Sequence, residues 1–347
     1  MNSLALLLSV LILSFIVTSI AIVPFINLLY KLKFQRAQQE SRDTFGVLTP
    51  IFNKFHKSKA GVPVGGGLLV IIVVTVLFLF LVPLIKYYGV DLTSNYEKIQ
   101  SEINIIFFTF LSFGLLGLYD DIMKFFNLKI KGLFGLRMKH KFIFEIILSS
   151  AIAVMLYSNL GISILNIPFI GTFDLGIFFI PFATFTIVSF ANAVNISDGL
   201  DGLAAGSLMI SLFGLWFLSS AILDVPVSIF LALFIGSLIS FLYFNVFPAR
   251  IFMGDVGSLA FGATLAVVGL LLGKVIALVV ISFIFVLEIS TSLIQLFSKK
   301  FLKRKVFPAA PIHLSLQKLG WEEPKIVQRA WLLQIMLTIF GVWLAVL

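Results

Sequence analysis

The chain has no cysteine among its 347 residues, which excludes a disulfide framework, a thiolate nucleophile and a cysteine-ligated metal site. It also has little charge: Asp, Glu, Lys and Arg make up 12% of the residues, whereas hydrophobic side chains make up 60%. The mean hydropathy of +1.12 is outside the range of ordinary soluble domains. The composition therefore predicts a polytopic membrane protein.

The hydrophobic residues gather in runs long enough to cross about 30 Å of hydrocarbon. We expect ten spans, at residues 4–29, 62–86, 103–118, 142–158, 175–194, 203–222, 226–247, 256–273, 275–297 and 330–347. The first run is too long for the core of a signal peptide and lacks a small-residue cleavage site, so we interpret it as a retained anchor. Because the eighth and ninth runs meet at Gly273 and Lys274, a merged or broken helix there is an alternative.

Basic residues are distributed unevenly between the two sides of the predicted bundle. Of the 25 Lys and Arg residues, all but Lys86, Lys98 and Lys274 fall in the first, third, seventh and ninth connections. Cytoplasmic connections of membrane proteins are enriched in Lys and Arg. We therefore expect these connections in the cytoplasm and both termini outside, and the net charge of +9 indicates orientation rather than nucleic-acid binding. The fourth connection contains two short β-prone runs, at 162–167 and 169–173, which predict a small hairpin outside.

One polar stretch, residues 192–206, interrupts this hydrocarbon-like sequence. Asn192, Asn195, Asp198 and Asp201 recur every third residue, which on a helix or its frayed end places them along one face. Glycines between and after them leave room for a backbone or a large ligand. Single Asn or Asp residues often cap helices or form turns. Four of them in register, at the end of a span where carboxylates are costly, favour a binding site.

Two further acidic motifs fall on the same predicted membrane face. Asp120 and Asp121 are adjacent at the end of the third span, one helical turn before Lys124. Two carboxylates and an ammonium suit a magnesium-bound phosphate, although an exposed helix end with an ion pair is an equal alternative. Asp255 begins the eighth span, where helix capping is the simpler interpretation. Its placement beside the other carboxylates favours a shared site.

Three other features are weaker signals. His313 lies in a Pro-rich segment of the ninth connection, on the acidic face. Lys59 precedes a glycine-rich start of the second span, which suits either phosphate binding or close helix packing. Glu288 and Gln295 lie seven residues apart in the ninth predicted span, hence on one helix face, and we expect them to form hydrogen bonds between helices.

Together these motifs resemble the polyprenyl-phosphate N-acetylhexosamine-1-phosphate transferases, and within them the muramoyl-pentapeptide branch. The matching segments occur in the family's order along most of the chain: GVPVGGG at 61–67, GLYDDIMK at 117–124, NAVNISDGLDGLA at 192–204, FNVFPARIFMGDVGSLAFG at 244–262 and APIHLSLQKLGWEEPKIVQRAW at 310–331. The resemblance implies one all-α transmembrane transferase domain over 1–347, with about ten helices, both termini outside and an active-site cleft facing the cytoplasm of a bacterial inner membrane.

The resemblance also implies the chemistry. Such an enzyme transfers phospho-MurNAc-pentapeptide from its UDP carrier to undecaprenyl phosphate and releases UMP, with Mg²⁺ as cofactor. Family members have been seen as dimers, which leaves a homodimer open for this chain. The resemblance assigns Asp120, Asp121, Asp255 and His313 to catalysis, with Asp255, Asp120 and Asp121 at the metal. It assigns to substrate binding Lys59, Lys124, Lys139, Asn192, Asn195, Asp198, Asp201 and Phe252.

The chain departs from the family pattern in two places. Leu314 and Ser315 follow His313 where the family has two more histidines, and Val62 and Val64 replace threonines. A catalytically lapsed homologue is therefore an alternative, although every acidic position is present. A UDP-GlcNAc transferase that forms undecaprenyl-linked GlcNAc-1-phosphate is the alternative within the family. An ion-coupled transporter is the alternative of another class, disfavoured because the carboxylates lie at span ends rather than at the midplane.

Overall fold

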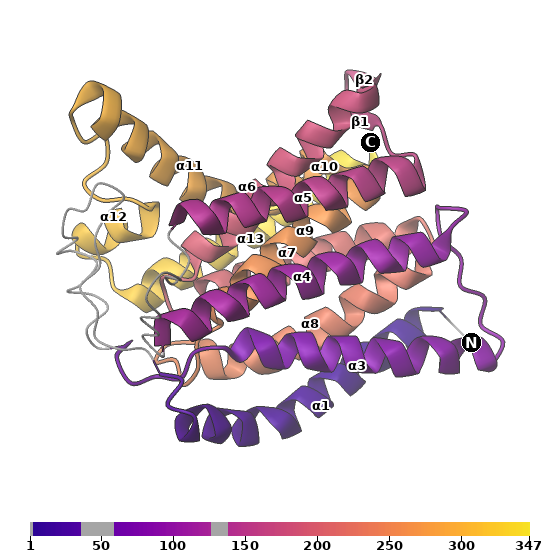
Figure 1. Ribbon diagram of the computed structural model, residues 1–347, viewed down its shortest axis with the longest axis horizontal. Helices are drawn as coiled ribbons and strands as arrows, with labels where there is room; N and C mark the ends of the chain where they lie inside the picture. Colours follow the sequence, from indigo (N-terminus) through magenta and orange to yellow (C-terminus); the bar gives the residue numbers. More distant parts are fainter. Residues whose placement is uncertain (1–2, 36–58, 126–137) are drawn as a thin grey trace.

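The computed structural model describes residues 3–35, 59–125 and 138–347, and within them the chain is a bundle of long helices (Figure 1). In these ranges, nine helices are long and apolar enough to cross a membrane. They are α1 (Ser3–Lys31), α3 (Gly66–Tyr87), α4 (Ile99–Phe125), α5 (Met138–Leu160), α6 (Phe179–Ser197), α7 (Leu203–Ala221), α8 (Val225–Asn245), α9 (Gly254–Leu271) and α13 (Glu323–Val346). The predicted polytopic helical membrane fold is confirmed.

The predicted span 275–297 is wrong as a single helix. It consists of α10 (Val275–Ile281) and α11 (Phe283–Phe297), which are bent by 85° relative to each other. In Figure 1, α11 points away from the bundle. A π-helical turn at Ser298–Leu302 and the short helix α12 (Ile312–Lys318) then lead to α13.

Side chains from neighbouring helices provide partners for the backbone groups at this bend. The Ile281 carbonyl accepts hydrogen bonds from Ser211 of α7, at 2.9 Å, and from Gln334 and Thr338 of α13. The Gln334 side-chain oxygen accepts from the Ile284 amide at 3.0 Å. A broken helix is tolerated in a membrane where other helices satisfy its freed polar groups. The residues that permit the bend therefore lie more than fifty positions away from it in the sequence.

Helices α8 and α9 form the centre of the bundle. Their apolar windows are 89% and 94% buried, whereas those of α1, α5 and α13 are less than a third buried. Helix α1 packs against α8 through hydroxyl groups: Ser14 donates to the Leu233 carbonyl at 2.6 Å, and Thr18 to Ser237 at 2.9 Å. Small polar residues bring helices together in this way where lipid provides no hydrophobic driving force.

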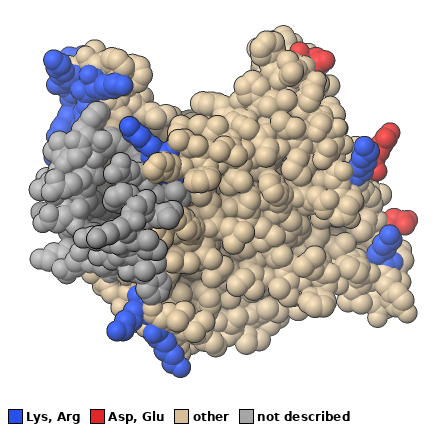
Figure 2. Space-filling model, viewed as in Figure 1, with Lys and Arg blue, Asp and Glu red and all other residues tan. Residues whose placement is uncertain are grey.

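Charged residues are concentrated at the two ends of the helices. On the face shown in Figure 2, the described Lys, Arg, Asp and Glu side chains leave a broad uncharged band between them. Both chain ends lie at one end of the bundle, and α12 lies at the other (Figure 1).

The hairpin predicted in the fourth connection is confirmed as β1 (Ile164–Ile167) paired antiparallel with β2 (Gly171–Asp174), followed by a 3-10 turn at Gly176–Phe178.

Glycines allow the helices around α9 to approach closely at the α12 end. A Cβ at Gly67 of α3 would lie 2.2 Å from Gly257 Cα of α9. The amides of Gly66 and Gly67 donate to the carbonyls of Phe252 and Met253, both at 2.9 Å. The glycine-rich start of α3 therefore serves close packing here, and these two amides are already engaged by the chain itself.

We expect Gly117→Ala to lower the thermal unfolding midpoint measured in detergent. A Cβ at Gly117 of α4 would lie 2.1 Å from the Asp255 carbonyl oxygen, so α4 and α9 would have to separate. Such overpacking costs about 1–3 kcal/mol. Leu115→Ala is the matched control, because Leu115 lies on the same helix and is 66% exposed. If the two variants have equal unfolding midpoints, α4 and α9 can accommodate the added Cβ without loss of stability.

Candidate active site

Two lysines and two carboxylates meet at the end of the bundle where α4 ends and α9 begins. Lys124 Nζ lies 2.9 Å from Asp120 Oδ2 and 2.7 Å from Asp255 Oδ2. Lys141 Nζ of α5 lies 3.2 Å and 2.5 Å from the same two oxygens. Three helices thus bring four charges together, with Asp120 almost completely buried and Lys124 46% exposed. The cluster can neutralise phosphate charge through its lysines and bind a cation through its carboxylates.

Asp121 contacts the start of α9, whereas its neighbour Asp120 contacts the two lysines. It is buried, and its Oδ2 accepts a hydrogen bond from the Val256 amide at 3.0 Å. This is an N-terminal amide of α9, which would otherwise lack a partner. The helix-capping role considered for Asp255 is therefore performed by Asp121 from another helix, and the Asp255 side chain turns to the two lysines.

The structure brings Lys141 to the carboxylates, whereas Lys139 is exposed. In the described part of the chain, Lys139 forms no ion pair with Asp120 or Asp255. Both lysines belong to the basic run at the start of α5, and residues two positions apart on a helix point in different directions. Sequence reasoning missed Lys141 because the run alone does not show which lysine faces α4 and α9.

Glu145 was also missed. It lies one turn after Lys141 on α5, is buried, and accepts a hydrogen bond from the Asn192 side chain at 2.5 Å. An acidic residue within an otherwise apolar span is rare and often functional, and that signal was present in the sequence. Glu145 therefore connects α5, which bears Lys141, to the end of α6.

The line of four polar residues from Asn192 to Asp201 divides into two parts. Asn192 and Asn195 lie on α6, which ends at Ser197, so Asp198 follows as its C-cap and Asp201 lies in the turn before α7. The side chains of Asn195 and Asp198 are half-buried. Because α6 ends between them, Asn192 and Asp201 do not share one helix face. Asn192 contacts Glu145, and Asp201 belongs to a second cluster.

The second cluster is centred on Lys59. Its Nζ lies 2.7 Å from Asp201 Oδ1, 2.6 Å from Glu323 Oε1 and 3.1 Å from the Gly199 carbonyl oxygen. Lys59 donates hydrogen bonds to Glu323 and to the Gly199 carbonyl, and its contact with Asp201 is an ion pair. Glu323, in the first turn of α13, was not identified from the sequence as a site residue. Lys59 therefore joins the start of α13 to the turn between α6 and α7.

Phe252 and His313 flank this second cluster. The Phe252 ring is buried, and Lys59 Nζ lies 5.9 Å from its centroid. His313 is buried, and its Nδ1 lies 2.8 Å from Glu288 Oε2 of α11. Its other nitrogen, Nε2, faces Gly199, where an added Cβ would lie only 2.7 Å away. The interior position expected for Glu288 is confirmed, and its contact orients the imidazole toward the turn that contains Asp201.

The carboxylates of the first cluster fit Mg²⁺ in donor type. Mg²⁺ prefers oxygen ligands and commonly takes one or two carboxylates, with phosphate oxygens and water in its other positions. The described residues contain no group of three or more His, Cys, Asp and Glu side chains arranged to hold a metal by themselves. The donor set therefore suits an ion whose coordination is completed by a bound phosphate, with Asp255 and Asp120 as the nearest carboxylates.

Comparisons with known proteins identify the family of the chain. Residues 103–273, which contain both clusters' aspartates, match the family described as Glycosyl transferase family 4. A phospho-N-acetylmuramoyl-pentapeptide-transferase of Clostridium perfringens is 37% identical over 318 residues, which cover 91% of each chain. Proteins of the same name from Aquifex aeolicus and Caldanaerobacter subterraneus are 35% and 34% identical, over 94% and 93% of this chain and 91% and 93% of theirs.

Proposed function

The chain belongs to the phospho-N-acetylmuramoyl-pentapeptide-transferase family, and we propose that it transfers phospho-MurNAc-pentapeptide from UDP-MurNAc-pentapeptide to undecaprenyl phosphate. The products are lipid I, an intermediate of peptidoglycan synthesis, and UMP. Membership confirms the resemblance inferred from the motifs. The observation that supports the proposal most directly is the group formed by Asp120, Asp255, Lys124 and Lys141 at one end of the membrane spans.

The reaction joins two strongly anionic substrates. An oxygen of the lipid phosphate forms a bond to the sugar-linked phosphorus of the donor, and the bond from that phosphorus to the bridging oxygen breaks, so that UMP leaves. Such phosphoryl transfers depend mainly on positioning and charge neutralisation. Lys124 and Lys141 supply two positive charges, and the less exposed Lys141 acts more strongly than it would in solution.

Asp120 is suited to hold the lipid phosphate in its ionised, attacking form. Its carboxylate lies between Lys124 and Lys141 and is almost completely buried. Bound phosphate would compete for the same two ammonium groups and release the carboxylate to accept a proton. Asp121, by holding the start of α9, keeps Asp255 in place beside these groups.

We propose Mg²⁺ as the cofactor, with Asp255 and Asp120 as its protein ligands. Asp121, which the sequence also assigned to the metal, instead accepts a hydrogen bond from the start of α9. When bound, the ion neutralises the negative charge of the diphosphate. Lys124 and Lys141 would neutralise phosphate oxygens that do not contact the ion. The second cluster, Lys59 with Asp201, Phe252 and His313, is proposed to hold the uridine end of the donor, since it offers an aromatic ring and hydrogen-bonding groups.

The site is proposed to face the cytoplasm of a bacterial inner membrane, with both termini outside. The described end of the bundle that contains the clusters also bears Lys299, Lys300, Lys303, Arg304 and Lys305, whereas Lys86, Lys98 and Lys274 lie toward the other end. This asymmetry is typical of a cytoplasmic face. A site on that side would meet a UDP-linked donor from the aqueous phase and a lipid substrate from the bilayer.

The test is UMP release by the purified full chain with undecaprenyl phosphate and Mg²⁺, comparing UDP-MurNAc-pentapeptide with UDP-GlcNAc. We expect release with the pentapeptide donor alone, and its loss when EDTA removes the metal. Release only with UDP-GlcNAc would assign the chain to the sister activity. If folded protein releases no UMP with either donor, the result would favour the transporter or the lapsed homologue.

A further inference from the structure

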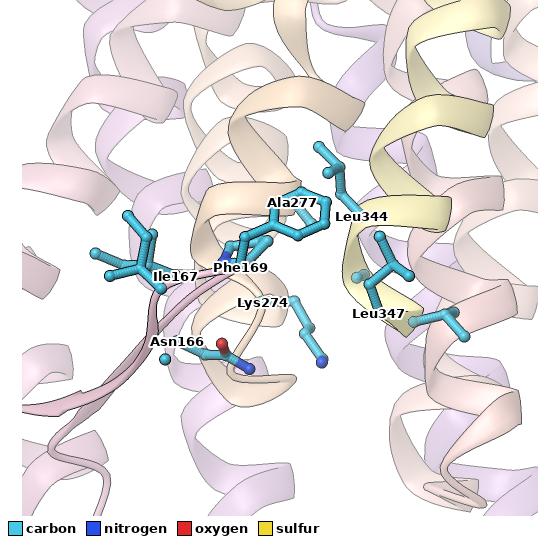
Figure 3. A pocket seen from close by; sticks show the side chains of 12 residues that line it. Asn166, Ile167, Phe169, Lys274, Ala277, Leu344 and Leu347 are labelled. Atoms are coloured by element: carbon cyan, nitrogen blue, oxygen red, sulfur yellow. The ribbon is translucent and has the colours of Figure 1, made fainter.

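A separate pocket lies at the end of the bundle away from the two clusters. Its volume is about 450 Å³, and it is enclosed by the tip of the β1–β2 hairpin, the start of α10 and the end of α13 (Figure 3). Helix α9 begins at the first cluster and ends just before Lys274, and α13 begins at the second cluster and ends at this pocket. The pocket is therefore a membrane-span length away from the proposed chemistry and plays no part in it.

Most of the side chains around this pocket are apolar. Figure 3 shows Phe169 lying beside Ala277 and toward Leu344, with Ile167 on the hairpin side. Phe169 is 78% exposed and has a φ of 66°, in the left-handed region that a bulky residue rarely occupies. The hairpin tip thus presents a large ring to the opening at a conformational cost, which is a frequent feature of binding sites.

Lys274 is the one basic residue that lines this pocket. It is half-buried, and Figure 3 shows its side chain between Asn166 and Leu347. In the part of the chain that the structure describes, no carboxylate forms an ion pair with it. An ammonium beside apolar walls gains most from an anionic partner, and the Asn166 amide adds a second donor.

Aromatic residues beside the pocket indicate its level in the bilayer. Trp343 and Phe340 of α13 are stacked, with ring centroids 5.4 Å apart, and are about half-exposed on the lipid side. The Phe169 ring lies 6.3 Å from Trp343. Tryptophan is enriched where hydrocarbon meets the headgroups. A ligand in this pocket therefore has its anionic group at headgroup depth and apolar contacts below it.

We propose that this pocket binds the headgroup of an anionic phospholipid from the leaflet opposite the catalytic clusters. The lipid phosphate pairs with Lys274 and accepts a hydrogen bond from Asn166, while the first methylenes of an acyl chain pack against Phe169 and Leu344. A free phosphate would leave the Phe169 and Leu344 side chains in water, whereas a lipid satisfies both parts of the pocket. The site is independent of the proposed transferase function.

The experiment compares lipid binding to the full chain in a neutral detergent, using native mass spectrometry with phosphatidylglycerol or phosphatidylcholine as the probe. We expect selective retention of phosphatidylglycerol. Lys274→Gln should weaken that binding about tenfold or more, as expected for the loss of a charged hydrogen-bond donor. Lys274→Arg should preserve it. Phe169→Ala should weaken binding of both lipids, because it removes apolar wall rather than charge.

Lys98→Gln is the matched control, since Lys98 lies toward the same end but is exposed and outside the pocket. Unchanged phosphatidylglycerol binding by folded Lys274→Gln would overturn the proposal, as would an equal loss in Lys98→Gln, which would indicate a diffuse charge effect. Competition by glycerol phosphate as strong as that by the lipid would assign the pocket to a soluble phosphate instead. Unfolding midpoints in lipid-free detergent show which variants are folded. If Lys274→Gln does not fold, Lys274→Arg and Phe169→Ala test the site in its place.

Discussion

Asp255→Asn is expected to lower the rate of UMP release by about 10³-fold or more, the largest effect of any single change in the site. The Asp255 carboxylate binds both Lys124, at 2.7 Å, and Lys141, at 2.5 Å. An amide keeps the shape but removes the charge that positions the two ammonium groups. It also removes a proposed Mg²⁺ ligand. Loss of one electrostatic group in an active site commonly costs 10²–10³-fold, and here one substitution affects three partners.

The measurement is the initial rate with saturating UDP-MurNAc-pentapeptide, undecaprenyl phosphate and Mg²⁺. Asp174→Asn is the control, because this exposed aspartate lies on the hairpin at the far end and should leave the rate unchanged. Size-exclusion chromatography and the thermal midpoint show that the variant is folded. A folded Asp255→Asn protein with more than a tenth of the parent rate would contradict the central role of this carboxylate.

Lys141→Ala is expected to lower the same rate by about 10²-fold or more, whereas Lys139→Ala should have little effect. The two residues are two positions apart on α5, but Lys141 contacts Asp120 and Asp255, and Lys139 is exposed. Removing Lys141 takes away a positive charge that the developing negative charge on phosphate requires. It also leaves two carboxylates, one of them buried, with one lysine between them.

This pair of variants tests whether the described arrangement or the motif-based assignment identifies the functional lysine. Lys141→Arg separates charge from shape, since a guanidinium retains the charge but spreads it over a planar group. We expect partial recovery of the rate in Lys141→Arg. The reverse result, a severe loss in Lys139→Ala and a mild one in Lys141→Ala, would assign the phosphate-binding role to Lys139.

Several parts of this structure follow from local sequence properties. Long apolar runs must be helical in a bilayer, because a helix satisfies its own backbone hydrogen bonds, so nine spans could be predicted from the sequence. Their ends agree within about four residues except at the end of α4 and the start of α13, where charged and polar residues extend the helix beyond the apolar run. The hairpin after α5 followed from two short β-prone runs broken by Pro168 and Gly171. The acidic motifs also predicted one shared face, because each lies at a span end and the order of spans determines which ends meet.

The bend between α10 and α11 could not be predicted in the same way. Residues 275–297 are uniformly apolar apart from Glu288, Gln295 and a few hydroxyl groups, and no Pro or Gly marks the break. The carbonyl of Ile281 is instead satisfied by Ser211, Gln334 and Thr338. Such a break depends on partners from distant helices, which only the packed structure brings together.

By itself, the sequence determined that this is a helical membrane protein of the transferase family and that the aspartates of its motifs gather at one membrane edge, because hydropathy, charge distribution and motif order can be read along the chain. Only the tertiary structure decided which of those residues contact one another. It paired Lys141 rather than Lys139 with Asp120 and Asp255, joined Asp201 to Lys59 and Glu323, and set Asn192 against Glu145. These contacts depend on the rotation of each helix about its axis, which is determined by packing against neighbouring helices rather than by local sequence.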